Sequence, residues 1–273
     1  MKNYNQSPLP FQGQKRRFLK KFIEALKDYP EDAVFVDLFG GSGLLSHTVK
    51  QFYPSARVVW NDFDNFQERL DNINTTNDLI TEVRLLLADE LKDKKVRDEV
   101  RHEILKLVAK HEYVDYVTLS SNILFSGKYM TDFSQLSKET FYNVVRQSPY
   151  FAEGYLKGVE RIRGDYKDVH QQFKDVPGVV FLVDPPYLST DTKTYGSSYW
   201  KLRDYLDVLT VLDGSSYFYF TSNKSQIVEL CEWIETRTYT GNPFFGSTMT
   251  TTGGSVNYNS SYTDIMLHKK ATD

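Results

Sequence analysis

Short apolar runs alternate with amphipathic segments in the first and last parts of the chain. Continuous apolar runs predict buried strands at Ala33–Leu38, Arg57–Asn61, Val179–Val183 and Tyr217–Thr221. Apolar residues at helical spacing predict helices at Phe18–Leu26, Ser42–Phe52, Trp200–Leu209 and Ser225–Thr236. Strands that alternate with helices form parallel sheets, so the pattern predicts an α/β fold with a doubly wound, mainly parallel sheet.

The middle of the chain has a different pattern. Asn77–His111 is helix-like, with charges of both signs that we interpret as solvated faces, and Ser137–Arg146 predicts another helix with Ser137 as its cap. No internal repeat or low-complexity tract interrupts this part. We therefore expect one helical insertion at 67–161, which divides a catalytic domain made of 1–66 and 162–273.

The end of the chain predicts a terminal antiparallel hairpin. Its two strands are expected at Arg237–Tyr239 and Tyr262–His268, with a stretch rich in Gly, Ser, Thr and Asn between them. Within that stretch, Asn242–Ser261 has the composition of a long polar loop, as does Leu188–Tyr199. Loops of this length are often functional or disordered.

The tetrapeptide Asp184-Pro185-Pro186-Tyr187 is the most informative motif. It ends the apolar run Val179–Val183, and because prolines cannot donate ladder hydrogen bonds, the strand must stop here and become a rigid loop. One carboxylate, proline carbonyls and one aromatic ring remain at the carboxyl end of the strand, where open α/β sheets bind ligands. These hydrogen-bond acceptors and the ring suit a planar group with an exocyclic amine, such as adenine. The alternative without a function is a turn that ends the strand and has a solvated aspartate.

Two further strand ends carry polar or glycine-rich signals. The first strand leads into Phe39-Gly40-Gly41-Ser42-Gly43, where glycine permits a tight turn and a close approach of backbone to ligand. No Gly-Lys-Ser/Thr follows, so this is not a Walker P-loop. About twenty residues later, Arg57–Asn61 is followed by Asp62 and then Asp64, either of which can bind ribose hydroxyls. Asp62 is favoured because it is nearer the strand end.

Composition narrows the classes of function. The 273 residues carry a formal net charge of −3. A protein that binds nucleic-acid phosphates over a large surface without specificity is expected to be basic, so this charge argues against that class. The single cysteine, Cys231, lies in a predicted helix, and the five histidines have no ligand spacing, so we expect no metal site. No apolar run approaches the roughly 20 residues of a membrane span and no signal-peptide core is present, so we expect a cytoplasmic protein without a membrane partner.

Taken together, these motifs resemble the Dam-type, adenine-N6-specific DNA methyltransferases. Pro10-Phe11-Gln12-Gly13-Gln14-Lys15-Arg16 is similar to the family's opening Pro-Phe-x-x-x-Gly-Gly-Lys segment, one residue shorter and with Gln14 in place of a glycine. Asp37–Gly43 resembles its S-adenosylmethionine loop, Asn61–Asp64 its ribose-binding acid, and Gly164-Asp165-Tyr166 its segment at the cofactor adenine. Asp184–Tyr187 matches its catalytic motif, and Phe220–Asn223 the strand that follows. Between Gln67 and Arg161 only Ser121–Tyr129 partly matches the family's target-recognition pattern.

The resemblance implies a methyltransferase-type Rossmann fold, S-adenosylmethionine as the cofactor, double-stranded DNA as the partner and no metal. It implies methyl transfer to N6 of a flipped adenine in a specific DNA sequence. The implied catalytic residues are Asp184, Pro185, Pro186 and Tyr187. The implied cofactor-binding residues are Phe11, Gly13, Lys15, Asp37, Phe39, Gly40, Gly41, Ser42, Gly43, Asp62, Phe63, Asp165, Tyr166 and Asp184. If the insertion is the recognition region, its DNA contacts are expected among Lys128, Lys138, Arg146 and Arg161.

Two alternatives stay open. The first is methylation of another planar amino group, either cytosine N4 or an RNA adenine. The second is a non-catalytic DNA- or cofactor-binding protein that keeps the fold, against which the intact tetrapeptide and glycine turn argue. The sequence leaves open the DNA target, the oligomeric state, and whether the enzyme works beside a restriction partner, in a phage or as a solitary methylase.

Overall fold

The computed structural model describes residues 4–125, 128–186, 200–223, 225–237, 241–257 and 260–271. It forms two compact units. The first consists of Met1–Gln6, Gln14–Asp64 and Gly154–Asp273, and the second of Ser7–Gly13 and Asn65–Glu153. We expected the insertion to cover residues 67–161. In the structure, the corresponding part of the second unit covers residues 65–153. The short segment 7–13, expected in the catalytic domain, groups with the second unit.

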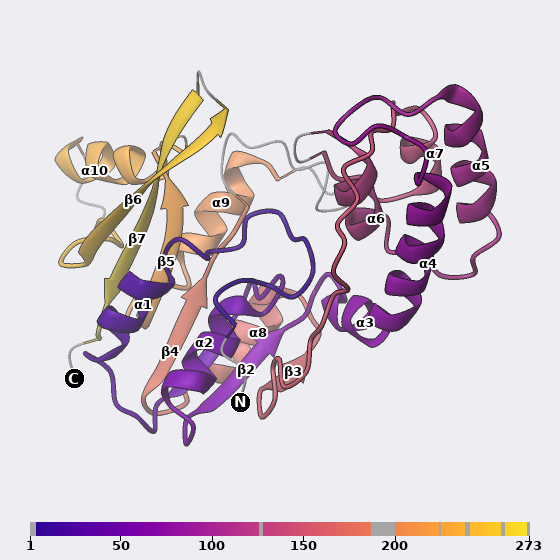
Figure 1. Cartoon of the computed structure of the whole chain (residues 1–273). Coiled ribbons are helices and arrows are strands. Elements are labelled where there is room, and N and C mark those ends of the chain that lie inside the picture. Colours follow the sequence, from indigo (N-terminus) through magenta and orange to yellow (C-terminus); the bar gives the residue numbers. More distant parts are fainter. Residues whose placement is uncertain are drawn as a thin grey trace. The chain divides into compact units, whose positions relative to one another are not determined.

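A mixed sheet forms the centre of the first unit (Figure 1). Its described strands are β1 (Val34–Asp37), β2 (Arg57–Asn61), β3 (Glu160–Ile162), β4 (Val179–Val183), β5 (Ser216–Ser222), β6 (Thr248–Asn257) and β7 (Ser260–Lys269). Their order across the sheet is β3-β2-β1-β4-β5-β7-β6. The pairs from β3 to β5 are parallel, whereas β7 runs antiparallel to both β5 and β6. The expected α/β fold with a mainly parallel Rossmann-like sheet is therefore confirmed.

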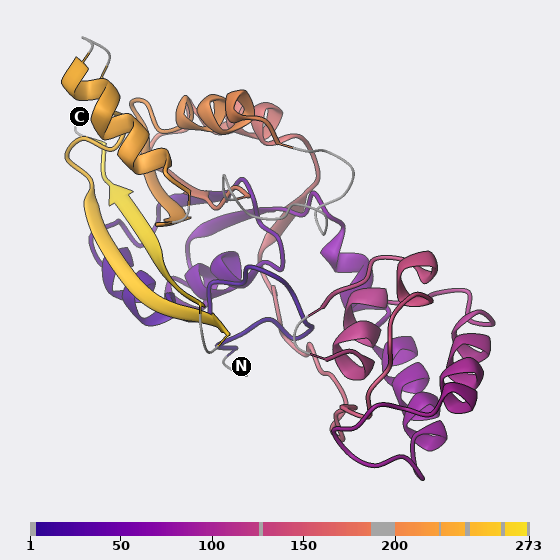
Figure 2. The same ribbon diagram turned by 90° about the horizontal axis from the view of Figure 1, so that it is seen from above.

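Helices cover both faces of the sheet, as expected for a doubly wound fold (Figure 2). They are α1 (Leu19–Leu26), α2 (Leu44–Phe52), α8 (Tyr166–Phe173), α9 (Leu202–Leu209) and α10 (Ile227–Arg237). On β4, Val180 and Leu182 pack with α1 and α2, while Phe181 and Val183 pack with the other three. A strand buried on both faces needs apolar residues at every position, which explains the continuous apolar run in the sequence.

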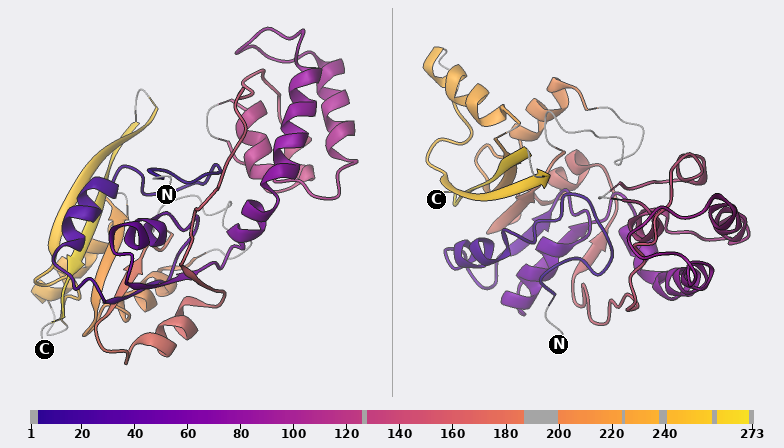
Figure 3. Two further views of the ribbon diagram at one scale, coloured as in Figure 1. Left: turned by 60° about the horizontal axis from the view of Figure 1, so that its bottom comes forward. Right: turned by 45° about the horizontal axis from the view of Figure 1, so that its top comes forward.

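The second unit is helical (Figure 3). Its described helices are α3 (Phe66–Asp71), α4 (Ile73–Leu86), α5 (Asp98–Val108), α6 (Tyr116–Ile123) and α7 (Phe133–Leu136). Its buried apolar residues include Leu79, Val83, Ile104, Leu119, Ile123 and Phe141. The single helix-like stretch expected at Asn77–His111 is divided into α4 and α5 by turns around Asp93, whose φ of 61° is left-handed. Within the described ranges, no helix is both long and apolar enough to cross a membrane.

The prediction of a helix at Ser137–Arg146 was wrong. Asp132 caps α7, Ser137 ends that helix, and the next residues run beside Asp93–Val96. Val96 N–H donates to Phe141 O at 2.9 Å, and Asp93 N–H donates to Asn143 O at 2.9 Å. The β-branched and aromatic residues of this segment favour such an extended conformation over a helix.

The terminal hairpin is present, but its first strand was wrongly placed. Arg237 ends α10, residues 238–239 lie outside the described part of the chain, and the strand that pairs with β7 is β6. β6 lies at the edge of the sheet, inside the segment expected to be the polar loop Asn242–Ser261. Threonine is β-branched and polar, so it favours a strand with a solvated face while lacking the apolar signature of a buried strand.

Candidate active site

Asp37 and Asp184 lie beside each other at the carboxyl edge of the sheet. β1 and β4 are parallel neighbours, with Asp37 opposite Leu182, so Asp184 follows one strand where Asp37 ends the other. The side chain of Asp37 is 1% exposed, and its Oδ2 accepts a hydrogen bond of 2.7 Å from Ser46 Oγ. Within the described residues its Oδ1 is buried without a hydrogen-bond partner. Burial raises the pKa of Asp37 to about 7, against the hydrogen bond from Ser46, and the charge of Asp184 adds to the rise.

Lys15 brings a cation to this edge. Its Nζ lies 2.6 Å from Oδ2 of Asp184, and the two side chains are 8% and 17% exposed. Burial raises the pKa of Asp184 to about 6, the Lys15 ammonium lowers it, and the carboxylate of Asp264 on β7 raises it further. Sequence reasoning missed Asp264, because only the antiparallel pairing of β7 with β5, which sets Asp264 opposite Ser222, carries it to this edge.

The prolines after Asp184 end the strand as expected. β4 stops at Val183, and Pro185 is buried while Pro186 is half-buried. Tyr187, the last residue of the candidate catalytic motif, lies outside the described residues, as does the segment 188–199. The structure thus brings Asp184, Asp37 and Lys15 together, and the position of the aromatic ring stays a prediction.

The glycine turn after β1 packs too tightly for side chains. A Cβ on Gly40 would lie 2.1 Å from Cδ1 of Trp60 and 2.8 Å from the carbonyl oxygen of Asn61. Gly43 caps α2 with a φ of 74°, and a Cβ there would meet Leu156 at 2.7 Å. Gly41 also has a positive φ, of 47°. Ser42 is buried, and its carbonyl oxygen accepts a 2.8 Å hydrogen bond from the Tyr155 hydroxyl. The turn is therefore rigid and leaves its backbone close to the sheet edge.

Asn61, at the end of β2, ties three strand ends together. Its Nδ2 donates to Leu38 O at 2.9 Å and to Gly164 O at 3.0 Å, and its Oδ1 accepts from Gly164 N–H at 3.0 Å. Asp62, the next residue, is fully buried, and its Oδ2 accepts a 2.8 Å hydrogen bond from Nε of Arg161. Arg161 was expected to contact DNA from the insertion. It lies instead on β3, in the first unit, because β3 pairs with β2 and extends the sheet.

Aromatic rings lie beside these strand ends. Phe39 contacts Tyr166 and Trp200 with ring centroids 4.8 and 5.9 Å apart, and Tyr166 stacks on Trp200 at 6.1 Å. Trp200 was not predicted as a site residue. Asp165 caps α8 by accepting from Lys167 N–H at 2.8 Å, which is the turn role that competes with a cofactor contact. Phe63 is 55% exposed.

The remaining expected site residues belong to the second unit. Phe11 packs edge-to-face on Phe66 at 5.6 Å, and the preceding Pro10 carbonyl accepts a 2.8 Å hydrogen bond from Arg69. Gly13 has a positive φ of 81°. No contact described in this unit tests a cofactor role for Phe11 or Gly13, which stays a prediction.

The three expected DNA contacts of the second unit have different surroundings. Lys128 is ion-paired with Glu139 at 2.9 Å. Arg146 stacks on Tyr150, with the guanidinium carbon 3.9 Å from the ring centroid. Lys138 is exposed, and no carboxylate of the described chain is within ion-pair distance of it. Residues 126–127, inside the segment with the partial recognition pattern, are outside the described part.

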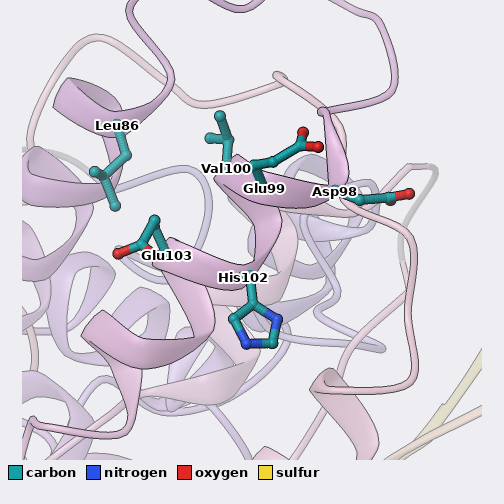
Figure 4. A pocket seen from close by; sticks show the side chains of 6 residues that line it. All are labelled: Leu86, Asp98, Glu99, Val100, His102 and Glu103. Carbon is teal, nitrogen blue, oxygen red and sulfur yellow. The ribbon is translucent and has the colours of Figure 1, made fainter.

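A pocket in the second unit has an acidic lining that does not suit an anionic ligand (Figure 4). It lies on α4 and α5 and is lined by Leu86, Asp98, Glu99, Val100, His102 and Glu103. Acidic side chains repel phosphates and do not match a carboxylate-bearing cofactor. Of the described residues, no group of three or more His, Cys, Asp and Glu side chains is arranged to hold a metal ion.

Comparisons with known proteins show the family of this chain. The chain is 35% identical over 277 residues to a proposed methyltransferase of Haemophilus influenzae, covering 98% of this chain and 93% of that protein. A solved rRNA methylase of Streptococcus thermophilus aligns over 96% of this chain and 99% of its own, at 10% identity and a TM-score of 0.34, which is too low to support an argument. The family described as D12 class N6 adenine-specific DNA methyltransferase matches residues 11–207. The chain therefore belongs to the D12 class of N6 adenine-specific DNA methyltransferases.

Proposed function

We propose that this protein transfers the methyl group of S-adenosylmethionine to N6 of an adenine that is flipped out of double-stranded DNA at a specific sequence. The observation that carries the proposal is the carboxylate of Asp184, held by Lys15 at the end of β4 and next to the glycine turn after β1. An acceptor for the target amine and a candidate cofactor loop thus lie at one sheet edge, where open α/β folds bind ligands.

The residues at this edge suit the cofactor. The buried Oδ1 of Asp37, unpaired among the described residues, can accept from the cofactor's ammonium group. Lys15 is paired with Asp184, yet an ammonium has three donors and can also serve the cofactor's carboxylate. We further propose that Asp62, which follows β2, binds the ribose hydroxyls and that the rings of Phe39 and Tyr166 contact the adenine. The bound cofactor supplies an activated methyl group on its sulfonium.

Asp184 and Pro185 have distinct tasks in this reaction. The adenine amine is a poor nucleophile, since its lone pair is delocalised into the ring. Asp184 accepts one amine hydrogen and the Pro185 carbonyl accepts the other, which favours a pyramidal nitrogen and stabilises the charge that develops on it. Tyr187, from the sequence motif, stacks on the extruded base. After transfer the proton is acidic, so either Asp184 or water can take it.

Nucleoside analysis tests the proposal. Purified protein is incubated with isotope-labelled S-adenosylmethionine and mixed-sequence duplex DNA, the DNA is digested, and the nucleosides are separated by mass spectrometry. We expect N6-methyldeoxyadenosine from the wild type. Asp184→Asn should lose at least a thousandfold in rate while binding the cofactor with an affinity within about tenfold of wild type.

Asp175→Asn, which changes an exposed carboxylate just before β4, is the matched control and should keep wild-type turnover. Label on N4-methylcytosine, or on RNA alone, would replace the adenine-DNA assignment with the corresponding alternative. Cofactor binding with no label in any nucleic acid would instead favour a non-catalytic binding protein. Sequencing of the methylated sites would then give the DNA target, for which we propose the second unit as the recognition element.

A further inference from the structure

The N-terminal part of the chain carries a charge opposite to that of the whole protein. Residues 1–23 contain six lysines and arginines and no aspartate or glutamate, in a chain whose formal net charge is −3. Five of these cations fall within Lys15–Lys21. Lys15 is buried at the candidate active site, whereas Arg16, Arg17, Lys20 and Lys21 are exposed. The exposed cations therefore surround the start of α1, directly after the residue that pairs with Asp184.

The β6–β7 hairpin extends this surface with uncharged polar residues. α1 lies beside the hairpin (Figure 3), and Phe18 and Phe22 of α1 share a buried cluster with Met266 of β7. Residues 241–263, which include β6, contain no charged side chain and are rich in Thr, Ser, Asn and Gly. Hydroxyl and amide groups of this kind are common donors to phosphate oxygens.

Contacts between α1 and the hairpin hold the cations without neutralising them. Arg17 donates to the hydroxyl of Tyr262 at 3.5 Å, and Lys21 donates to the carbonyl oxygen of Thr251. Both acceptors are uncharged. In the described part of the chain, no carboxylate is within ion-pair distance of Arg17, Lys20 or Lys21, whereas Lys27 further along pairs with Glu24. Asp264 is the carboxylate on β7 whose charge interacts with Arg17, so Lys20 and Lys21 are the cleaner probes.

We propose that this α1–hairpin surface, formed by Arg17, Lys20, Lys21 and the polar residues Thr248–Thr252 of β6, binds the phosphate backbone of duplex DNA. This inference rests on the proposed function for the identity of the duplex and adds a contact surface in the catalytic unit itself. Because the surface begins beside Asp184, it would grip the backbone close to the base that reacts. It carries no base-reading role, since phosphate contacts fix position without conveying sequence.

Salt dependence of DNA binding tests the surface. Lys20→Gln/Lys21→Gln is compared with wild type by fluorescence anisotropy on a duplex, from about 50 to 300 mM salt. Each phosphate contact contributes about 0.9 to the slope of log affinity against log salt. We expect the variant's slope to be shallower by about two, and its affinity for target and scrambled duplexes alike to fall about 10- to 100-fold at 0.1 M salt.

The matched control is Lys157→Gln/Lys174→Gln. It removes the same charge from two exposed lysines that precede β3 and β4 and are not part of the proposed surface. Its slope should stay at the wild-type value, and both variants should keep wild-type melting temperature and cofactor affinity.

An unchanged salt slope in Lys20→Gln/Lys21→Gln would overturn the proposal that this surface binds DNA. An equal change of slope in the control variant would overturn it as well. A wild type that binds duplex DNA with the expected slope but incorporates no methyl group would overturn the proposed function and leave the surface standing. Loss of binding to single-stranded RNA alone, with duplex binding unchanged, would reassign the surface to RNA.

Discussion

Lys15 Nζ lies 2.6 Å from Oδ2 of Asp184, in a part of the site where both side chains are largely shielded from water. The pKa of Asp184 is raised to about 6 by burial, and Lys15 is the main influence that lowers it. In the proposed reaction the Asp184 carboxylate accepts one amine hydrogen, and it can do so only when it is deprotonated. Methyl transfer at saturating cofactor and DNA should therefore rise with pH through about 6 in the wild type.

Lys15→Met should move this rise of the methyl-transfer rate to higher pH, because the Asp184 carboxylate loses the cation that stabilises it. The pH profile of single-turnover methyl transfer is the measurement, taken at saturating cofactor because Lys15 is also proposed to contact the cofactor carboxylate. Lys174→Met, which removes an exposed cation at the end of α8, should keep the wild-type profile. A Lys15→Met profile that superimposes on the wild type would show that the ion pair does not control the titration of Asp184.

Asp37 predicts an unusual pH dependence of stability. Its pKa is raised from 3.8 to about 7 in the folded protein, so the folded state binds the proton more tightly than the unfolded state does. The contribution of Asp37 to stability is fully present below pH 3.8 and is lost as the pH rises through about 7. Asp37→Asn should thus gain stability relative to wild type between pH 5 and pH 8, by on the order of 1–3 kcal/mol. Urea unfolding at the two pH values measures it; a pH-independent difference would contradict the assignment.

Gly40→Ala should destabilise the first unit and weaken cofactor binding together. The new Cβ would lie 2.1 Å from Trp60 and 2.8 Å from the backbone of Asn61, so the turn or the strand end must move. Overpacking of this kind costs about 1–3 kcal/mol or more. Gly253→Ala is the control, because a Cβ there meets nothing within 4 Å. Thermal unfolding and cofactor titration of both variants check the prediction, and equal melting temperatures would contradict it.

The central strands could be predicted because burial on both faces leaves a local signature. Arg57–Asn61 and Val179–Val183 have the limits expected from the apolar runs alone. Parallel pairing then requires the strand ends to share one edge, so the proximity of Asp37 and Asp184 also follows from the pattern. The local pattern could not predict β6, whose threonines are exposed or half-buried at the sheet edge and have the composition of a polar loop.

Contacts made by distant segments were likewise beyond local reasoning. Asp264 reaches the active-site edge through the register of β7 against β5, and Trp200 through its packing on Tyr166. Arg161 was assigned to the insertion because its three-residue strand is too short for a periodic signal. Its pairing with Asp62 depends on a partner 99 positions away in sequence.

The ion pair between the buried Asp62 and the partly exposed Arg161 predicts unequal effects of its two partners. Arg161→Gln removes the cation that pairs with the buried Asp62 carboxylate, which should cost less than the about 3–5 kcal/mol of a fully buried pair, because the Arg161 side chain is 41% exposed. Asp62→Asn leaves a half-exposed arginine that water can solvate, so its stability cost should be smaller, while cofactor affinity should fall by up to a few kcal/mol. Urea unfolding and calorimetric cofactor titration separate the two effects. The opposite order of stabilities would show that Arg161, not Asp62, is the costly member to leave unpaired.

Lys138 is the cation of the second unit whose surroundings best suit a DNA contact. It is exposed and lacks an ion-pair partner in the described chain, whereas Lys128 is paired with Glu139 and the guanidinium of Arg146 lies on the ring of Tyr150. A cation that already has a carboxylate partner gains less from a phosphate, since the earlier pairing must be given up. Lys138→Ala should therefore reduce the salt slope of duplex binding by about one, and Lys128→Ala by clearly less. Anisotropy titrations at several salt concentrations measure both slopes. If Lys128→Ala had the larger effect, the pair with Glu139 would have to exchange for DNA on binding, and if neither slope changed, recognition would lie elsewhere than on this face of the second unit.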